Sequence, residues 1–404
     1  MHILYLHQYF TTPEKGGGTR SYEFARRLVA RGYRVTMVTG NNRLQVDFSP
    51  GQKWTELEIE GIRVIVIPVG YSNYMSAKER VRSFLRYAWL AVRAGWRVCN
   101  PDLVFATSTP LTVGIPGLVL RLRHRVPLIF EVRDLWPEAP VQMGVFRNKF
   151  LVWGLRVLER MIYRGARHVV ALSPGMVDGV ARQGVAREKI TMIPNSSDTE
   201  IFQPGESREG FLQKWGLQGK FVVAYGGAMG EANGLDLIVE AAERLQEMGR
   251  EDIVFALAGD GKARPFVEEE VKRRQLENVV LMGPQDKYTV AHLYRAAGAA
   301  LVLFKHLPVL QTNSPNKFFD ALAAGVPVVA NMEGWVHRLL EEEEAGVPIP
   351  PADAGALVEA VMALCQEPER RERMAKNARR LAETQFDRDA LAEQLEELLL
   401  KHAR

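Results

Sequence analysis

The run Ser314-Pro315-Asn316-Lys317 combines a helix start with a positive charge. Serine is favoured at the N-cap of a helix and proline at its first position, and the unpaired N–H groups there attract anions. A lysine in the first turn is unfavourable for the helix dipole unless an anion is bound nearby. The run therefore predicts a phosphate site that involves Pro315, Asn316 and Lys317.

Asp320 follows Asn316 by four residues and Lys317 by three, so the three side chains share one side of the expected helix. A cation and free backbone amides suit a diphosphate, and the carboxylate of Asp320 is placed to accept hydrogen bonds from ribose hydroxyls. Lys317 and Asp320 would also form an ordinary surface ion pair on a capped helix, and this alternative stays open.

Glycine-rich segments follow two strands expected in the second half of the chain. Gly226 and Gly227 follow the first of them, and Lys262 and Arg264 lie in the segment after the second. Open parallel sheets bind ligands at the carboxyl ends of their strands, and glycine lets a backbone approach a ligand closely. We expect these segments to meet Lys317 around one phosphate-bearing molecule.

A third glycine run, Gly16, Gly17 and Gly18, lies between the first expected strand and a helix that starts near Ser21. Its spacing is neither GxGxxG nor GxxxxGK[ST], which disfavours a nicotinamide-dependent dehydrogenase and a P-loop NTPase. The run is either a mobile connection or a ligand loop.

Arg133 and Asp134 open a charged run that closes another expected strand. Charged groups are costly at such a position unless they pair or act on a ligand. The two residues therefore form either a structural ion pair or part of an acceptor site.

Short apolar runs alternate with helical periodicity along nearly the whole chain, which indicates parallel sheets covered by helices. Two such series are separated by a stretch rich in turn formers, from Pro194 to Gly205. The expected fold class is α/β, with two Rossmann-like doubly wound domains facing a cleft. The domains are expected at 1–195 and 206–384, with a helix at 385–404 that crosses back to the first. Strands are expected at 2–6, 34–39, 62–67, 102–106, 127–132, 167–172 and 190–193, then at 220–226, 253–259, 278–282, 298–304 and 325–331.

Charge is distributed unevenly, with 28 Lys and Arg against 16 Asp and Glu in residues 1–200 and an acidic second half. Residues 78–99 and 147–167 mix cations with aromatic and aliphatic side chains at helical spacing. This mixture fits helices on an anionic membrane surface, although apolar stripes are more often simply core. The acidic second half disfavours nucleic acid as a partner.

No apolar run is long enough to span a bilayer, and the first twenty residues resemble no secretion signal, so a cytoplasmic location is expected. Cys99 and Cys365 lie far apart without a CxxC motif or a Cys/His cluster. This pattern indicates neither a disulfide framework nor a zinc site.

The chain resembles the retaining GT-B glycosyltransferases of family 4. The resemblance rests on MHILYLHQYF with its GGG loop, on RDLWPE, on the IPN linker and on SPNKFFDALAAGVPVV, in the expected order over nearly the full length. It is closest to bacterial WbuB-like N-acetylfucosaminyl transferases of O-antigen and capsule assembly. Each motif alone is unspecific, and the combination carries the resemblance.

The resemblance implies an acceptor-binding first domain and a second domain that holds a UDP-sugar. Lys317 and the amides near Gly227 would then neutralise the diphosphate, and Asp320 would hold the ribose. Residues 16–18 would border the acceptor and the phosphates, and the final helix would return to the first domain.

Several positions depart from the pattern of the family. Thr312 and Asp320 stand where two glutamates are usual, and Ala228 and Asn233 replace the common arginine and lysine that clamp the diphosphate. Arg133 replaces an acceptor-side histidine. Lys317, with Lys262 or Arg264, must then supply the positive charge.

Together with the resemblance, which implies UDP as the nucleotide, an N-acetylated amino sugar and a lipid-linked or glycan acceptor for surface polysaccharide, these observations predict a retaining sugar transferase. Fixed cations and amides stabilise the departing diphosphate, so neither a metal nor another cofactor is expected. Lys317 and Asp134 are the catalytic candidates, Asp134 as the group that orients the acceptor hydroxyl. The enzyme would be peripheral on the inner face of the cell membrane. A nucleotide-sugar epimerase or hydrolase of the same fold is the main alternative, and a non-catalytic sensor a weaker one.

Overall fold

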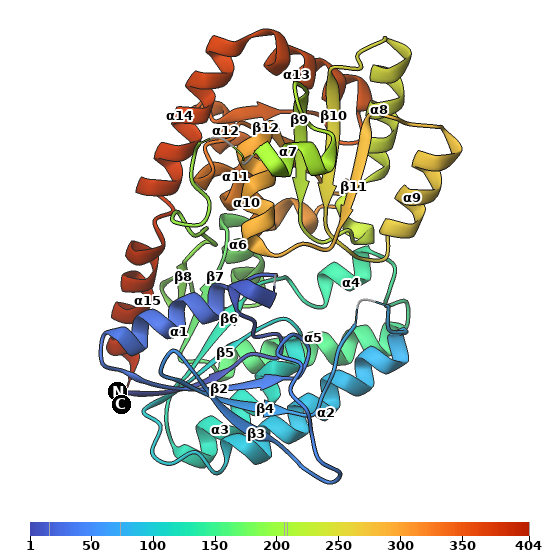
Figure 1. Cartoon of the computed structure of the whole chain (residues 1–404). Helices are drawn as coiled ribbons and strands as arrows, with labels where there is room; N and C mark the ends of the chain where they lie inside the picture. Colours follow the sequence, from blue (N-terminus) through green and yellow to red (C-terminus); the bar gives the residue numbers. More distant parts are fainter. Residues whose placement is uncertain (16, 73, 206, 208, 404) are drawn as a thin grey trace. The chain divides into compact units, whose positions relative to one another are not determined.

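The computed structural model describes residues 1–15, 17–72, 74–205, 207 and 209–403 (Figure 1). The chain forms two compact units. Unit 1 consists of Met1–Pro194 together with the residues from Asp389 onward, and unit 2 of Asn195–Arg388.

Unit 1 is built on an eight-stranded sheet in the order β3-β4-β2-β1-β5-β6-β7-β8. Only β3 runs antiparallel to its neighbour, β4. Its alternating sequence TELEI was not among the expected strands, because one of its faces is polar and exposed. The strands are β1 (His2–Leu6), β2 (Arg34–Gly40), β3 (Thr55–Ile59), β4 (Ile62–Ile67), β5 (Leu103–Thr107), β6 (Leu128–Val132), β7 (His168–Ala171) and β8 (Ile190–Met192).

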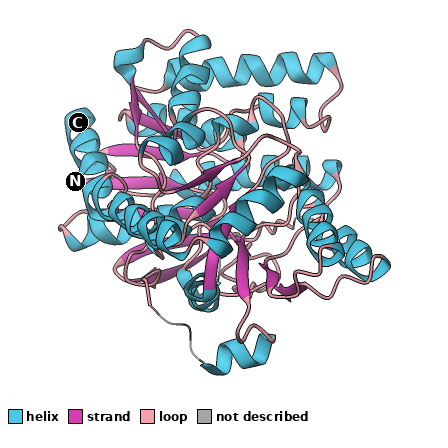
Figure 2. Cartoon of the chain, turned by 90° about the horizontal axis from the view of Figure 1, so that it is seen from above, coloured by secondary structure: helices cyan, strands magenta, loops and turns pink. Residues whose placement is uncertain are grey.

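Alternate side chains of β1 enter two different cores, one on each face of the sheet. Leu4 and Leu6 belong to one buried cluster and Ile3 and Tyr5 to the other. Helices pack against the strands (Figure 2). The helices of unit 1 before the final one are α1 (Arg20–Ala30), α2 (Ala77–Gly95), α3 (Gly114–His124), α4 (Glu138–Gln142), α5 (Lys149–Gly165) and α6 (Pro174–Arg182), with short 3-10 turns at Pro13–Lys15, Leu111–Val113 and Arg187–Lys189.

The final helix, α15 (Arg388–His402), completes one core of unit 1. Leu391, Leu395 and Leu399 are buried in the same cluster as Ile3 and Tyr5 of β1. Arg27 of α1 and Arg31, which directly follows the helix, also form ion pairs with Asp389 and Glu396 of α15. The last residues of the chain are therefore part of the domain that begins it.

Unit 2 has a six-stranded parallel sheet in the order β11-β10-β9-β12-β13-β14. Strand β9 lies between β10 and β12, so the strand order reverses next to it, and ligands bind outside the carboxyl ends of strands at such a point. The strands are β9 (Phe221–Gly226), β10 (Ile253–Ala258), β11 (Val279–Gly283), β12 (Ala297–Val302), β13 (Val328–Ala330) and β14 (Gly346–Pro348). The helices are α7 (Glu209–Trp215), α8 (Asp236–Glu247), α9 (Arg264–Arg273), α10 (Lys287–Ala296), α11 (Asn316–Ala323), α12 (Trp335–Glu342), α13 (Ala354–Gln366) and α14 (Pro368–Thr384), with 3-10 turns at Glu231–Asn233 and Leu310–Thr312.

No helix among the described residues combines the length and the apolar content that crossing a membrane requires.

Candidate functional site

The two glycine segments of unit 2 lie against each other at one edge of the sheet. Gly226 pairs with Ala258 in the register of β9 and β10, so the segments that follow start side by side. A Cβ on Gly259 would lie 1.9 Å from the carbonyl oxygen of Gly227. Gly227 and Gly261 have φ values of +151° and +152°, which L side chains rarely adopt. Glycine is required here because backbone packs directly on backbone.

Lys317 reaches this edge from α11 and is buried, with 7% of its surface exposed. Its Nζ donates hydrogen bonds to Tyr225 Oη at 2.9 Å and to Asn233 Oδ1 at 2.8 Å. The ammonium also lies 4.3 Å from the centre of the Tyr225 ring and 5.0 Å from that of Phe304. Its hydrogen-bond partners are both uncharged, and burial lowers the pKa of Lys317 to about 7.

The start of α11 differs by one residue from the expectation that Ser314 is its N-cap. The helix begins at Asn316, Pro315 takes the cap position, and no side chain caps the helix. The hydroxyl of Ser314 instead accepts a hydrogen bond from the backbone N–H of Asn195 at 3.3 Å. Asn195 Nδ2 also donates to the Ser314 carbonyl at 2.6 Å, so this residue anchors the turn before the helix.

Asp320 and Lys317 do not form the surface ion pair that remained the alternative. Asp320 Oδ1 accepts a hydrogen bond from Ser197 Oγ at 2.5 Å, whereas Lys317 turns toward Tyr225 and Asn233. The structure therefore separates the two charges, and the half-buried carboxylate stays on its own side of α11.

The other two expected cations are less available. Lys262 is exposed in the turn after β10. Arg264 begins α9 and forms ion pairs with Glu268 at 2.6 Å and with Asp260 at 3.6 Å. Lys317 is thus the better-placed cation of the three.

Tyr225 and Asn233 are the residues that reasoning from sequence missed as partners of Lys317. Asn233 was noted only as a departure from the family pattern, and Tyr225 was included in an expected strand without a role of its own. A hydroxyl-bearing ring one residue before Gly226, in a strand whose other side chains are apolar, is the signal that could have identified Tyr225.

In unit 1, Arg133 and Asp134 do not pair with each other. Asp134 Oδ2 accepts a hydrogen bond from the Thr109 hydroxyl, and burial raises the pKa of Asp134. Arg133 Nη1 lies 3.3 Å from His7 Nε2. The charge of Arg133 acts on Asp134, but no hydrogen bond or ion pair joins these two described residues, which favours the acceptor-site interpretation over the structural ion pair.

His7 is a further buried group that the sequence reasoning did not single out. It directly follows β1, and its Nδ1 lies 2.8 Å from Ser21 Oγ of α1. Burial and the neighbouring Arg133 hold the pKa of His7 well below its usual range, so the ring is neutral. Since Arg133 donates to Nε2, the ring proton resides on Nδ1 and points toward Ser21.

Gly17 and Gly18 lie just before α1, between a short 3-10 turn and the helix. Gly17 is exposed and has a φ of +91°, so a residue with a side chain would be strained at this position. Gly16, the first residue of the run, lies outside the described residues.

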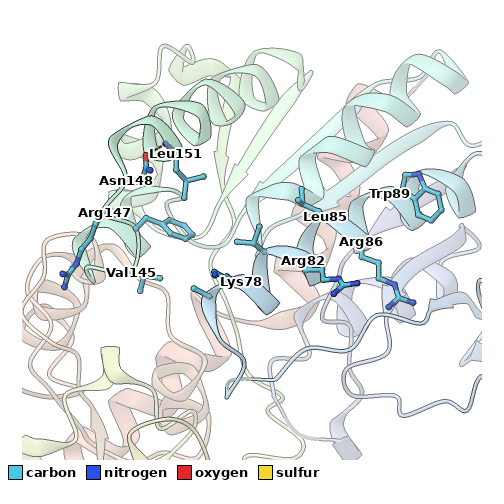
Figure 3. A pocket seen from close by; sticks show the side chains of 12 residues that line it. Lys78, Arg82, Leu85, Arg86, Trp89, Val145, Arg147, Asn148 and Leu151 are labelled. Atoms are coloured by element: carbon cyan, nitrogen blue, oxygen red, sulfur yellow. Dashed lines mark hydrogen bonds between the residues drawn. The ribbon is translucent and has the colours of Figure 1, made fainter.

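Helices α2 and α5 correspond to the two basic aromatic stretches, and each has both a core face and an exposed face. On α2, Tyr87 and Ala91 are buried in the core, whereas Leu85 and Trp89 are 54% and 57% exposed. A groove of about 810 Å³ separates α2 from residues 145–151, and Figure 3 shows side chains reaching it from both sides. The apolar residues of α2 are therefore not all core.

Two family descriptions match the chain, one in each half. Residues 15–196 match the "Glycosyl transferase 4-like domain" and residues 207–381 the "Glycosyl transferases group 1" domain. Among characterised relatives, the alpha-D-kanosaminyltransferase of Streptomyces kanamyceticus is 30% identical over 241 residues. That match covers 59% of this chain and 61% of the relative.

Solved structures resemble the chain over nearly its full length. Sucrose-phosphate synthase from Thermosynechococcus elongatus has a TM-score of 0.77 at 20% identity and covers 99% of this chain and 98% of its own. Anabaena Alr3699/HepE, solved in complex with UDP-glucose, has a TM-score of 0.73 at 19% identity. The match covers 99% of this chain and 100% of the HepE chain.

These likenesses confirm the expected fold, a two-domain α/β protein with Rossmann-like GT-B architecture. Because the two family descriptions together span most of the sequence, the chain belongs to the GT-B glycosyltransferases that join a 4-like domain to a group 1 domain.

Proposed function

We propose that this protein transfers a sugar from a UDP-sugar and that unit 2 binds the donor at the carboxyl edge of its sheet. One observation carries the proposal. Lys317 is a buried cation whose hydrogen-bond partners are uncharged, and it lies beside the glycine loop of Gly227. Burying a charge without a counter-charge is unfavourable, so the site is built for an anion that arrives later.

A nucleoside diphosphate suits this site in shape and in charge. Its phosphates approach the glycine backbone closely, and the uncapped start of α11 offers N–H groups beside Lys317. Asp320 lies one turn further along α11 and accepts hydrogen bonds from the ribose. UDP as the nucleotide is supported by Anabaena HepE, whose structure contains UDP-glucose. An amino sugar as the transferred group is supported by the relative named as a kanosaminyltransferase and by the WbuB-like motifs.

The same charges assist the chemical step. As the glycosidic bond breaks, the leaving diphosphate gains negative charge, and a fixed ammonium with fixed amides stabilises it more strongly than the bound donor. The reaction then requires no protein nucleophile, and we propose a front-face displacement with retention of anomeric configuration. Lys317 provides the charge that a metal ion would otherwise supply.

On the acceptor side we propose that Asp134 orients the attacking hydroxyl, near Arg133 and the loop of Gly17 and Gly18. Its raised pKa suits a group that takes up a proton as the hydroxyl attacks. The acceptor is a lipid-linked glycan of surface polysaccharide synthesis, reached on the inner face of the cell membrane. The exposed apolar and basic residues of α2 and α5 support this location.

A two-step experiment tests the proposal. A thermal-shift series with UDP, GDP and ADP sugars should show the largest protection by a UDP-sugar, since ligands that bind only the folded state raise its melting temperature. Protection by GDP- or ADP-sugars alone would contradict the donor assignment. Mass spectrometry of the best donor, incubated with and without a lipid-linked acceptor, should then show product only with the acceptor. Release or isomerisation of the sugar without acceptor would instead establish the hydrolase or epimerase alternative.

A further inference from the structure

The groove between α2 and residues 145–151 presents apolar side chains to solvent. Its described lining includes Trp89 and Leu85, both more than half exposed, and Leu151, which is 45% exposed. Its volume of about 810 Å³ lies within the roughly 300–1,000 Å³ typical of small-molecule pockets. A contiguous exposed apolar surface of this kind marks a binding site more often than a scatter of single side chains does. The remaining apolar lining residues are Val81, Val145 and Phe146.

Positive charge borders the groove along its whole length. Lys78, Arg82 and Arg86 recur every four residues on α2 and therefore form one row, and Arg147 is a fourth cationic lining residue, outside α2. No acidic residue occurs among the described lining residues. Like charges at this spacing destabilise a helix slightly, and an anion bound along the row would remove that repulsion.

The apolar residues of α2 form a second row beside the cations. Val81, Leu85 and Trp89 also recur every four residues, one position away from Arg82 and Arg86. Two parallel rows, one apolar and one cationic, match a single molecule that has an apolar chain and an anionic head.

The groove is also connected to the proposed acceptor site through aromatic contacts. Phe146, in its wall, packs edge-on against Trp136 with ring centres 5.9 Å apart, and Trp136 packs against Phe84 of α2 at 6.1 Å. Trp136 lies two residues after Asp134. A molecule held in the groove is therefore held beside the segment that carries Asp134.

We infer that this groove binds the acceptor itself, a lipid phosphate or diphosphate whose apolar chain lies along Val81, Leu85 and Trp89 and whose phosphate contacts the cationic row. The inference rests on the proposed function and sharpens it, because it gives the lipid phosphate anchor of the proposed acceptor a binding site of its own. A concave site encloses one chain, whereas docking on a bilayer would require only an exposed apolar face.

The experiment measures the affinity of the protein for farnesyl diphosphate by calorimetric titration in solution. Farnesyl diphosphate is used below the concentration at which it aggregates. Farnesol supplies the chain without the charge, and inorganic pyrophosphate supplies the charge without the chain. Farnesyl diphosphate should bind at least about tenfold more tightly than either control, and its affinity should fall as salt increases. Equal affinity for pyrophosphate and farnesyl diphosphate would overturn the inference.

A matched pair of variants locates the binding. Leu85→Glu places a carboxylate in the groove and should weaken farnesyl diphosphate at least about tenfold. Leu122→Glu makes the same change on α3, at a residue that is 70% exposed and does not line the groove, and should leave the affinity unchanged. Both positions are solvent-exposed, so both variants fold. Equal affinity in the two variants would place the lipid elsewhere.

Two further measurements separate the remaining explanations. If the protein sediments with vesicles of anionic phospholipid but does not bind farnesyl diphosphate in solution, the surface docks on bilayers and the acceptor inference is wrong. Thermal protection by UDP tests the donor site independently of the groove, and Leu85→Glu should leave it intact. If UDP does not raise the melting temperature of the unaltered protein, the proposed function is wrong, even if farnesyl diphosphate binds to the groove.

Discussion

Two buried cations, one in each unit, have opposite surroundings. In unit 1, Arg20 donates to the buried carboxylate of Glu131 at 2.9 Å and to the carbonyl oxygen of Ile193 at 2.8 Å. In unit 2, the hydrogen-bond partners of Lys317 among the described residues are a tyrosine hydroxyl and an amide oxygen. A cation whose counter-charge is built into the fold holds the fold together, and one without it is available to a ligand. The comparison therefore assigns a role in stabilising the fold to Arg20 and a role in binding and catalysis to Lys317.

The largest effect is expected from Lys317→Met, which keeps the length of the side chain and removes the charge. Loss of a preorganised group that stabilises transition-state charge costs on the order of 100- to 1,000-fold in kcat. The melting temperature should stay unchanged or rise, because the variant no longer buries an uncompensated charge. Steady-state kinetics and thermal denaturation of the same preparation check both points, and parallel losses of activity and stability would give Lys317 a structural role.

Arg20→Met should show the reverse pattern. It leaves Glu131 buried without its counter-charge, so the free energy of unfolding should fall by about 3–5 kcal/mol. Denaturant titration measures this loss, and Arg20→Met combined with Glu131→Met should restore much of it. A fully stable single variant would remove the contrast between the two cations.

The low pKa of Lys317 gives the contrast a pH dependence. Because the pKa is about 7 in the folded protein and near 10.5 when the chain is unfolded, the unfolded state binds more protons between these values. The contribution of Lys317 to stability therefore rises with pH above 7, as the buried charge is discharged. UDP binding requires the charged form, so its affinity should fall by up to about tenfold per pH unit above 7. Calorimetry from pH 6 to pH 9 measures this slope, and Lys317→Met should flatten it.

Asn233 should act through Lys317, with a smaller effect. Asn233→Ala removes one acceptor of the ammonium, so KM for the donor should rise several-fold while the fold stays intact. Asn278→Ala is the matched control, since Asn278 is also buried in unit 2 and its Nδ2 donates to the carbonyl of Ala242 at 2.8 Å. The control should lose about 0.5–1.5 kcal/mol of stability and keep its KM. If both variants change KM equally, Asn233 has no special role.

The smallest effect is expected from chelation. If Lys317 and the amides carry the charge of the diphosphate, EDTA should change kcat/KM less than about twofold. A large loss that Mg²⁺ restores would show that a metal shares this work.

The sequence predicted the fold and the loops better than it predicted contacts. The alternation of apolar runs and helical periods identified nearly all the strands, because buried parallel strands leave a strong local signal. Strands β3 and β14 were missed, and in β3 the polar face weakens that signal.

Contacts between separate elements were the difficult part. The surroundings of Lys317 come from β9, from the 3-10 turn of Glu231–Asn233 and from α11, whose meeting depends on the whole sheet. Likewise, the sequence left Arg133 and Asp134 as a possible ion pair, since neighbours in sequence are obvious partners. Only the fold shows that each turns to a different residue, His7 and Thr109.

The position of α15 affects how the chain is made. The cluster that contains Ile3 and Tyr5 is completed by Leu391, Leu395 and Leu399, which are synthesised almost four hundred residues later. While the chain grows on the ribosome, this part of the first domain stays without its final apolar cover, and the entire second unit is translated before the cover arrives. Newly made unit 1 therefore lacks this apolar cover until α15 has been translated, and the apolar surface exposed during that interval favours aggregation.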